Sequence, residues 1–487
     1  MTEGTDVTME PSPALQSLEI RGLSADSRKI GPGDLFAALP GTVSDGRRFI
    51  DDAVAQGAAA VLTPPGTTLK DYGRPLAQLI DENPRRRLAL MAARFYGRQP
   101  KTIAAVTGTN GKTSVAEFTR QIWQAEGLKA ATLGTLGLVP AQPGAPASLT
   151  TPDPVDLHRC LAALAGDGFD HLAMEASSHG LDQYRLDGVA VGAAAFTNLS
   201  RDHLDYHGDT AAYLAAKRRL FAELVAPGGS AVLNADVPEF EMLRATVLDR
   251  GLKLITYGQG GSELRLAARS PAPAGQELEI EVFGKRHEVE LPLAGGFQAA
   301  NALAALGLAI ATGSDPEAAV MALGRLTGVP GRLELVARSS RGGLIFVDYA
   351  HTPDALASLL AALRPHTKGR LVAVFGCGGD RDRGKRPIMG EIAGRLADLA
   401  IVTDDNPRGE DPTAIRQEIL TAIPGAREIG DRMQAIEAGI ALLGPGDTLV
   451  VAGKGHEPGQ IVGDKVLPFD DREAVRAAVA RASEDET

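Results

Sequence analysis

The sequence predicts an α/β fold divided into three domains, and three observations support this prediction. First, the chain has 487 residues, and at roughly 150 residues per domain this length favours three separate cores. Second, apolar strand-like segments alternate with helical segments from Ile103 onward, which is the order of a parallel sheet covered by helices. Third, the alternation begins again after a stretch rich in Gly, Arg and Ser, so we expect a smaller doubly wound domain near the carboxyl end.

Domain boundaries are predicted where the composition changes. The segment GRQPKT is typical of a connection, and TGVPGRLELVARSSRGG separates an alanine-rich helix from a new strand. We therefore predict domains at residues 1–100, 101–338 and 339–487, the last of them Rossmann-like. The strands expected in the central domain are IAAVTG, HLAMEAS and AAAFTNLS, and those expected in the last domain are LIFVDYA, RLVAVFG, DLAIVTD and DTLVVAG.

The composition argues against several classes of protein. A net charge of -11 and a pI near 5.4 oppose broad attraction to nucleic acid or to anionic lipid. The first residues, MTEGTDVTMEPSPALQ, are acidic and polar where a signal peptide needs a basic end and an apolar stretch. We therefore expect a cytoplasmic protein without membrane insertion. Cys160 and Cys377 lie far apart, so neither a disulfide framework nor a zinc site is expected.

A glycine turn at residues 107–114, TGTNGKTS, follows an apolar strand and opens a helix. This is the context of a loop whose backbone N–H groups hold phosphate. Lys112 would neutralise the β and γ phosphates, and the Thr113 hydroxyl would bind Mg²⁺. The general pattern has four residues between its glycines, whereas Gly108 and Gly111 enclose two, so an ordinary loop with an incidental GKT is the alternative.

The shorter loop resembles the ATP loop of the Mur ligases and of the related folylpolyglutamate synthases. Further motifs resemble those of the Mur ligases in family order, from Ser27 to Glu457. The resemblance implies ATP and Mg²⁺ as cofactors and a central ATP-binding domain beside an amino-terminal uridine-binding domain. The loop residues that it assigns to ATP are Gly108, Thr109, Asn110, Gly111, Lys112, Thr113 and Ser114.

A second group of polar residues follows two other predicted strands. Glu175 comes directly after HLAM, at the strand end where parallel sheets bind ligands, and TNLSRDHLDYHG carries two histidines near the next strand end. Taken alone, Glu175 is more often a solvated acid than a ligand, and Lys217, in YLAAKRRLF, is interpreted as an exposed lysine. The resemblance implies instead that Glu175 and His203 contact Mg²⁺ and that Lys217 is carbamylated, which would let it hold a second Mg²⁺.

Other sites are implied by the resemblance alone. The loop GTVSDGR lacks the histidine that the family often has, so no uracil contact is carried over there, and DSR could also be a simple turn. The residues assigned to the UDP-linked substrate are Ser27, Arg28, Thr150, Thr151, Ser177, Gln183 and Arg185. The further residues assigned to ATP are Asn301, Arg332, Asp348 and His351, with Gln298 standing where an asparagine is common.

The last domain carries candidate residues for an amino acid substrate. FGCGGDRDRGKRP fails the dinucleotide pattern G-x-G-x-x-G, because the last glycine position holds Arg381. The run instead presents basic side chains at 381, 383, 385 and 386, which suit a carboxylate or phosphate. The residues assigned to diaminopimelate by the resemblance are Arg381, Asp405, Asn406, Pro407, Arg408, Gly453 and Glu457.

The motif DNPR distinguishes between amino acid substrates. Meso-diaminopimelate differs from lysine by a second carboxylate, for which Arg408 offers a forked donor. The resemblance implies ATP-dependent ligation of meso-diaminopimelate to UDP-N-acetylmuramoyl-L-alanyl-D-glutamate through an acyl phosphate, by a monomer acting in peptidoglycan synthesis. The alternatives are a lysine-adding ligase, a folylpolyglutamate synthase-like ligase, and a scaffold that binds ATP without turnover.

Overall fold

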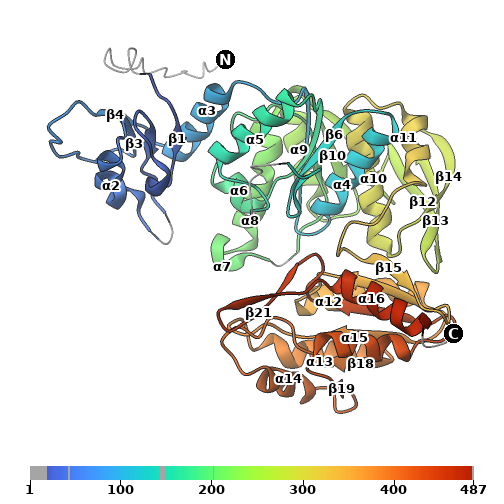
Figure 1. Cartoon of the computed structure of the whole chain (residues 1–487). Helices are drawn as coiled ribbons and strands as arrows, with labels where there is room; N and C mark the ends of the chain where they lie inside the picture. The colour runs from blue at the N-terminus through green and yellow to red at the C-terminus, as the bar shows by residue number, and fades with distance from the viewer. Residues whose placement is uncertain (1–18, 42–43, 143–148, 201, 485–487) are drawn as a thin grey trace.

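The computed structural model describes residues 19–41, 44–142, 149–200 and 202–484. The amino-terminal segment on which the prediction of location depends lies outside these residues. The chain folds around three sheets, in the mixed α/β, three-domain arrangement that the sequence predicts (Figure 1). None of the helices in the described part of the chain combines the length and apolar character needed to cross a membrane.

The amino-terminal sheet has four parallel strands in the order β1-β2-β3-β4. Its elements are β1 (Leu23–Ser24), η1 (Ser27–Lys29), β2 (Leu35–Ala37), η2 (Gly46–Phe49), α2 (Ile50–Ala55), β3 (Ala60–Thr63), β4 (Ala77–Ile80) and α3 (Pro84–Tyr96). Leu35 packs on the side of α3, whereas the next residue, Phe36, packs on the side of α2. Successive residues of a strand face opposite sides, so both faces of this sheet are covered.

The central sheet has ten strands in the order β14-β13-β12-β11-β10-β9-β5-β8-β6-β7. These are β5 (Thr102–Thr107), β6 (Ala130–Gly134), β7 (Gly137–Val139), β8 (His171–Glu175), β9 (Val191–Phe196), β10 (Val225–Asn234), β11 (Lys253–Gly258), β12 (Leu264–Ala272), β13 (Gly275–Val282) and β14 (Lys285–Leu291). Strands β12, β11, β10, β9, β5, β8 and β6 run parallel, whereas β7, β13 and β14 pair antiparallel at the two edges. The parallel strands include the three that the sequence predicts.

Helices cover both faces of this sheet. One layer contains α4 (Lys112–Ala125), α10 (Gly296–Ala311) and α11 (Pro316–Leu323). The other contains α5 (Pro154–Gly166), α6 (Ser178–Asp182), α7 (Leu204–His207), α8 (Thr210–Arg219), η3 (Leu220–Leu224) and α9 (Phe240–Asp249). Within β5, Val106 packs with the first layer and Ala105 with the second. Since β5 lies between β8 and β9, the loops after these three strands meet at one edge.

The carboxyl-terminal sheet has the order β15-β16-β20-β17-β18-β19 and is parallel except for β15. Its elements are β15 (Glu334–Arg338), β16 (Leu344–Asp348), α12 (Pro353–Leu363), η4 (Arg364–His366), β17 (Leu371–Phe375), α13 (Lys385–Leu396), β18 (Leu399–Val402), α14 (Pro412–Leu420), β19 (Arg427–Glu428), α15 (Arg432–Ala441), β20 (Thr448–Ala452), β21 (Gly459–Val462), β22 (Lys465–Pro468) and α16 (Asp471–Glu484). Strand β15 pairs with this sheet although it precedes the boundary predicted at residue 338, which stays a prediction.

The central and carboxyl-terminal parts touch through backbone. A Cβ atom on Gly331 would overlap the backbone of Gly455, so these two segments of the chain are in direct backbone contact. A second contact comes from His366, whose Nε2 accepts a hydrogen bond from the N–H of Gly295 at 2.9 Å and whose Nδ1 lies 2.7 Å from the carbonyl oxygen of Ala272. The loop that follows β20 and the short helix η4 therefore contact the central part of the chain, and Figure 1 shows the two parts adjacent.

Candidate active site

The loop between β5 and α4 requires glycine at two positions. Gly108 and Gly111 have φ of +148° and +87°, which side chains rarely allow. A Cβ on Gly108 would also overlap the hydroxyl of Thr197, and one on Gly111 would overlap Oδ1 of Asn301. The loop is therefore a tight turn at the amino end of α4, the geometry that exposes backbone N–H groups to an anion.

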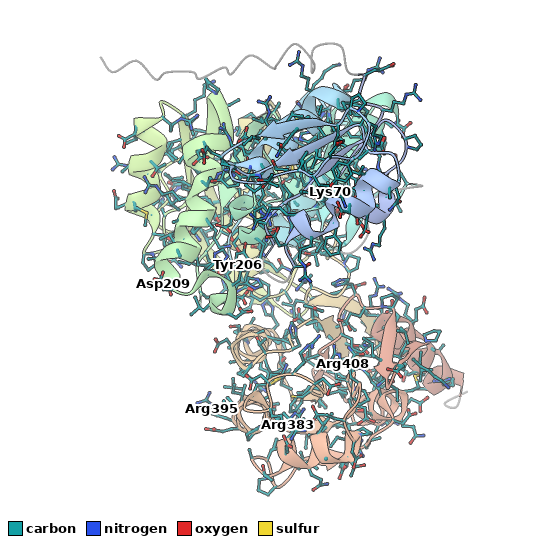
Figure 2. The ribbon with its side chains drawn as sticks, turned by 90° about the vertical axis from the view of Figure 1, so that its left-hand side faces the viewer. Lys70, Tyr206, Asp209, Arg383, Arg395 and Arg408 are labelled. Atoms are coloured by element: carbon teal, nitrogen blue, oxygen red, sulfur yellow. The ribbon has the colours of Figure 1, made fainter. Side chains whose placement is uncertain are left out.

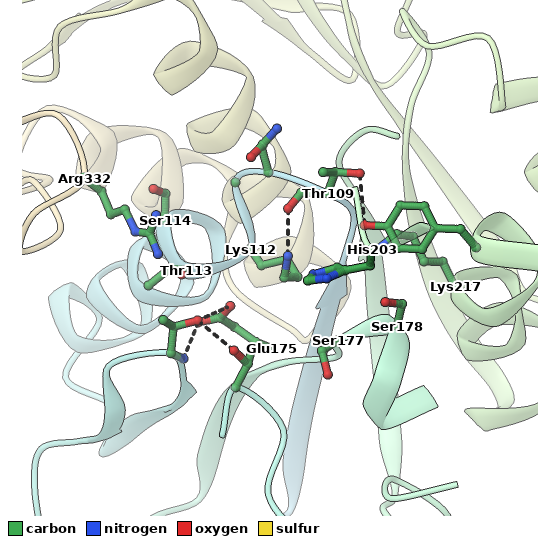
Figure 3. Close-up of a pocket in the computed structure, with 15 residues that line it drawn as sticks. Thr109, Lys112, Thr113, Ser114, Glu175, Ser177, Ser178, His203, Lys217 and Arg332 are labelled. Carbon is green, nitrogen blue, oxygen red and sulfur yellow. Dashed lines mark hydrogen bonds between the residues drawn. The ribbon is translucent and has the colours of Figure 1, made fainter. Parts of the chain in front are cut away.

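Residues after β9 hold this loop in place. The N–H of Thr109 donates to the carbonyl oxygen of Asn198 at 2.8 Å, and the N–H of Asn110 donates to Oδ1 of Asn198 at 3.0 Å. Nζ of Lys112 donates to the carbonyl oxygens of Gly108 and Thr109, at 3.0 and 2.8 Å. Burial lowers the pKa of Lys112, while the charge of Glu175 acts in the opposite direction. Its ammonium thus lies over the loop (Figure 3).

Glu175 enters the same pocket from the end of β8, and its side chain is buried. Its Oε1 accepts from the N–H of Thr135 at 2.7 Å, and its Oε2 accepts from the Thr135 hydroxyl at 3.2 Å. That hydroxyl also lies 3.1 Å from the hydroxyl of Thr150. Both Glu175, labelled in Figure 3, and Thr150 therefore line the pocket.

Lys217 is buried, with 1% of its surface exposed, rather than solvated. Its Nζ donates to the carbonyl oxygen of Gly108 at 2.8 Å and lies 4.2 Å from the ring centroid of Tyr213. Burial, reinforced by the charge of Lys112, lowers the pKa of Lys217 to about 6. The side chain is therefore mainly a neutral amine at pH 7, directly beside the phosphate loop.

His203 lines the pocket at the start of α7. Its backbone is left-handed, with φ of +51°, and its Nε2 lies 3.5 Å from Oδ2 of Asp202. The ring contacts that of His179, with centroids 4.8 Å apart. About half of its side chain is exposed, so the imidazole borders both the pocket and solvent.

Thr151, Ser177 and Arg185 form one hydrogen-bonded wall. The Thr151 hydroxyl donates to the carbonyl oxygen of Glu175 at 2.9 Å and accepts from the N–H of Ser177 at 3.0 Å. Arg185 donates to the carbonyl oxygen of Thr151 at 2.7 Å and to Oε1 of Gln183 at 2.8 Å. The structure does not bring Ser27 or Arg28 to this pocket, because both lie on η1 beside the amino-terminal sheet, where Arg28 pairs with Asp26.

Of the later residues assigned to ATP, Arg332 lines the pocket. Its guanidinium lies 4.6 Å from the ring centroid of Tyr349, and its buried Nε has no hydrogen-bond partner among the described residues. Asn301 lies against Gly111 beneath the loop. Asp348 and His351 do not line the pocket. Asp348 instead accepts from the N–H groups of Leu333 and Ala350, at 2.6 and 2.8 Å, and the His351 ring contacts Tyr349.

The DNPR loop lies under the β21–β22 hairpin. Arg408 has φ of +52°, its N–H donates to the carbonyl oxygen of Ile461 at 3.0 Å, and its own carbonyl accepts from Gly463 at 2.7 Å. Its Nη1 donates to the carbonyl oxygen of Gly379 at 3.0 Å. Asn406 donates to Oε2 of Glu457 at 3.0 Å. The structure therefore brings Asn406, Arg408 and Glu457 together.

The other four residues assigned to diaminopimelate are Asp405, Gly453, Arg381 and Pro407. A Cβ on Gly453 would meet Oδ2 of Asp405, so these two positions pack together. The Arg381 side chain is exposed and its Nη1 donates to the carbonyl oxygen of Asp380 at 3.0 Å. Pro407 precedes Arg408 in the same buried turn. Figure 2 shows Arg408 in the carboxyl-terminal part of the molecule, away from Tyr206 and Asp209.

The expectation that the four cations of the run at residues 381–386 are available to a ligand is wrong for Arg386. Its side chain is fully buried, and it pairs with Glu410 at 2.9 Å and with Glu418 at 2.9 Å. Arg383 also pairs with Glu410, at 2.7 Å, and Nζ of Lys385 donates to the carbonyl oxygen of His351 at 2.8 Å. The run therefore mainly anchors α13, because Glu410, before α14, and Glu418, in α14, neutralise Arg383 and Arg386.

Sequence reasoning missed several residues of these two groups. Thr135 and Tyr213 line the pocket, and Lys454 is buried against Asn406. The signal for Lys454 was its place between Gly453 and Gly455 directly after a buried strand. Thr135 follows another strand of the sheet, β6, in the same way, so strand ends were the pattern to extend.

The described residues contain no cluster of three or more His, Cys, Asp and Glu side chains that would hold a metal alone. The pocket nevertheless combines Thr113, Glu175 and His203 around a loop that glycine keeps open. Mg²⁺ often has only a few protein ligands, mainly oxygen atoms, because the phosphates of the substrate complete its coordination shell. The donor set therefore fits a metal that arrives with a nucleotide.

The fold and this loop define a class of protein that binds nucleotide phosphates at the carboxyl edge of a parallel sheet. Family models match at residues 19–96 (Mur ligase family, catalytic domain), 106–309 (Mur ligase middle domain) and 331–455 (Mur ligase, glutamate ligase domain). The chain belongs to the Mur ligase family of ATP-dependent ligases.

Two curated relatives bear the same name, UDP-N-acetylmuramoyl-L-alanyl-D-glutamate--2,6-diaminopimelate ligase. That of Caulobacter vibrioides is 57% identical over 458 residues, covering 93% of this chain and 94% of the relative. That of Bradyrhizobium diazoefficiens is 56% identical over 481 residues, covering 98% of each. Both alignments therefore include all three parts of the fold.

Solved structures resemble the whole chain. One, of a UDP-N-acetylmuramoyl-L-alanyl-D-glutamate--2,6-diaminopimelate ligase, matches with a TM-score of 0.72 and 36% identity over 95% of each chain. The MurF ligase from Thermotoga maritima in complex with ADP matches with a TM-score of 0.63 and 20% identity, covering 97% of this chain and 100% of that one. At that identity, the second likeness shows the fold alone.

Proposed function

We propose that this protein joins meso-2,6-diaminopimelate to UDP-N-acetylmuramoyl-L-alanyl-D-glutamate, with ATP converted to ADP and phosphate. The observation that carries the proposal is Arg408, whose backbone is held by the hairpin and whose guanidinium donates to the carbonyl oxygen of Asn406, while the Asn406 side chain donates to Glu457. A guanidinium next to a carboxylate matches an amino acid end that has both a carboxylate and an ammonium. The names and high identity of the relatives support the same substrate.

The first half of the reaction is assigned to the central pocket. The N–H groups of residues 108–114 would hold the phosphates of ATP, and Lys112 would leave its carbonyl contacts to neutralise the transferred group. Thr113, Glu175 and His203 would hold Mg²⁺, which supplies positive charge at the phosphate oxygens. The free carboxylate of the D-glutamyl residue attacks the γ phosphorus, so the bond to ADP breaks and an acyl phosphate forms.

Lys217 is proposed to be carbamylated. A neutral amine attacks CO₂, a nitrogen–carbon bond forms and the amine loses a proton, so N6-carboxylysine results. The lowered pKa of Lys217 supports this step because it provides the neutral amine near pH 7. The product would replace a neutral amine beside Lys112 with an anion able to hold a second Mg²⁺.

Binding of the UDP-linked substrate is assigned to two regions. Ser27 and Arg28 would contact the uridine end, and the wall formed by residues 150–151 with Ser177, Gln183 and Arg185 would contact the muramyl end. The hydrogen bonds that join Thr151, Ser177 and Arg185 support a preformed surface. Since α3 packs against α5, the two regions have a common rigid support.

The amine is delivered by the carboxyl-terminal part. Arg381, Arg408 and Glu457 would orient diaminopimelate while Asn301, Arg332, Asp348 and His351 complete the ATP site. The amine nitrogen then attacks the acyl carbon, the amide bond forms and phosphate leaves. We propose that closure of this part gates turnover. Identical small-angle scattering profiles with and without the three substrates would contradict that proposal.

The experiment that tests the function is phosphate release by the purified protein with ATP, Mg²⁺ and UDP-N-acetylmuramoyl-L-alanyl-D-glutamate. Each of meso-diaminopimelate, lysine and glutamate is supplied in turn. We expect release only with diaminopimelate, and none from the Lys112→Ala variant. Release with lysine would assign the lysine-adding reaction, release with glutamate and a folate acceptor would assign the synthase-like reaction, and no release with any combination would favour an ATP-binding scaffold.

We further propose a cytoplasmic monomer that acts in peptidoglycan synthesis, and hence in cell wall biogenesis, cell shape and division. The substrates are then small molecules, with no nucleic acid and no membrane partner, and the acidic net charge of -11 supports this. Sedimentation at micromolar concentration tests the oligomeric state. A dimer peak would contradict it.

A further inference from the structure

We propose that Lys454 positions the amino acid site and determines its selectivity for diaminopimelate over lysine; this inference rests on the proposed function. Lys454 follows β20 and its side chain is fully buried. A buried ammonium is costly unless charge and hydrogen bonds compensate it. The reason for its presence must therefore lie in what it contacts.

All three donors of the Lys454 ammonium have acceptors from different segments. Nζ lies 3.1 Å from Oδ1 of Asn406, 3.1 Å from Oε2 of Glu457 and 2.6 Å from the carbonyl oxygen of Gly459. An ammonium has three N–H donors, so none remains for a ligand. Lys454 thus joins the DNPR loop, the following turn and the first residue of the β21–β22 hairpin at one point.

The contacts orient the carboxylate of Glu457. Asn406 and Lys454 both donate to its Oε2, at 3.0 and 3.1 Å. Over the described ranges of the chain, no hydrogen bond or ion pair goes to Oε1 of Glu457. One oxygen is therefore held in place by two donors while the other is available to an ammonium group from outside.

The contacts of Lys454 and Asn406 also set the position of Arg408 relative to the available oxygen of Glu457, Oε1. Oδ1 of Asn406 accepts from Lys454 and also from the N–H of Ile461, at 2.9 Å. The neighbouring hairpin residues bond to the backbone of Arg408 on both sides. Because Lys454 holds the start of the hairpin and Asn406 together, the distance between the Arg408 guanidinium and the Glu457 carboxylate depends on it.

The charge of Lys454 also favours one substrate. The positive charge of Lys454 compensates the negative charge of Glu457, so these two side chains together have a net charge near zero. Arg408 then remains the cation that faces the ligand. A zwitterionic end, as in diaminopimelate, brings a carboxylate for Arg408 and an ammonium for Glu457. The end of lysine brings only an ammonium, which meets no net negative charge and lies near Arg408. Like charges at short range are repulsive, so Lys454 disfavours lysine.

The test compares kcat/KM for meso-diaminopimelate with kcat/KM for lysine in the full-length protein, with UDP-substrate and ATP saturating. Lys454→Met keeps the length of the side chain and removes its charge. We expect the ratio of the two constants to fall by about tenfold, the change that ~1.4 kcal/mol corresponds to. The KM for ATP should stay constant. Lys465→Met, on the exposed strand β22, is the matched control and should keep the ratio.

A second variant tests the charge argument in the opposite direction. Glu457→Gln leaves Lys454 uncompensated, so both substrates should bind more weakly but the ratio should rise. If Lys454→Met fails to fold by thermal melting, this rise remains a complete test. Equal losses for both substrates in every variant would overturn the inference, whereas inactivity of the unmodified protein with diaminopimelate would overturn the proposed function instead.

Discussion

Replacing Arg408 by methionine should selectively remove the use of diaminopimelate. Nη1 of Arg408 already donates to the carbonyl oxygens of Gly379 and Asn406, at 3.0 and 3.3 Å. Nη2 and Nε remain for the distal carboxylate of the substrate, as a forked pair. A hydrogen bond to a charged group contributes about 1.5–3 kcal/mol, and because the side chain is only partly buried we take ~2–3 kcal/mol for the pair.

This loss corresponds to a fall in kcat/KM for diaminopimelate of about 30- to 150-fold. The kcat/KM for lysine should not fall, because its end has no carboxylate for the guanidinium and its ammonium is no longer repelled by Arg408. The assay is phosphate release with the amino acid varied and the other substrates saturating. Arg408→Lys keeps the charge without the fork and should recover only part of the loss. Equal losses for both amino acids would refute the reasoning, because they would indicate a general disruption of the loop.

Three other changes test the pocket and its support. Gly111→Ala should weaken ATP binding more than tenfold by calorimetry, because it adds left-handed strain of ~1–2 kcal/mol to an overlap with Asn301; unchanged affinity would contradict this geometry. Lys217→Met should abolish any stimulation of phosphate release by added bicarbonate, and persistence of the stimulation would assign it to another group. Burial lowers the pKa of His158, whose Nε2 lies 3.0 Å from the carbonyl oxygen of Asp187. The free energy of unfolding of the unmodified protein should therefore fall as pH drops below about 6.5. In that range the unfolded chain binds a proton that the buried His158 ring in the folded protein does not readily accept. Urea titrations of His158→Gln should show a smaller fall.

The sequence predicts the strand ends that form the pocket better than it predicts the contacts between them. Lys112, Glu175 and His203 each follow a strand of one parallel sheet, and the carboxyl ends of such strands meet at one edge. Their convergence therefore follows from topology. The antiparallel extension by β13 and β14 is not predicted although these strands alternate polar and apolar residues, because the prediction followed the continuous apolar runs that are typical of buried parallel strands.

Burial of charged residues could not be predicted, because it depends on partners far along the chain. Lys217 lies beside two arginines, which favours an exposed helix face, yet the loop at Gly108 covers it from 109 residues away. Arg386 lies in a run of cations, and Glu410 neutralises it from 24 residues away. Lys454 joins Asn406 across 48 residues. Local patterns contain no information about such pairs.

The contact between Gly331 and Gly455 lies at the junction of the central and carboxyl-terminal parts of the chain. Arg332 follows one glycine and lines the central pocket, while Glu457 comes two residues after the other and accepts a hydrogen bond from Asn406. Rotation about a point moves the distant rim of a body much more than the atoms near the axis. If the proposed closure turns the carboxyl-terminal part about this contact, Arg332 and Glu457 move little while the outer loops travel widely.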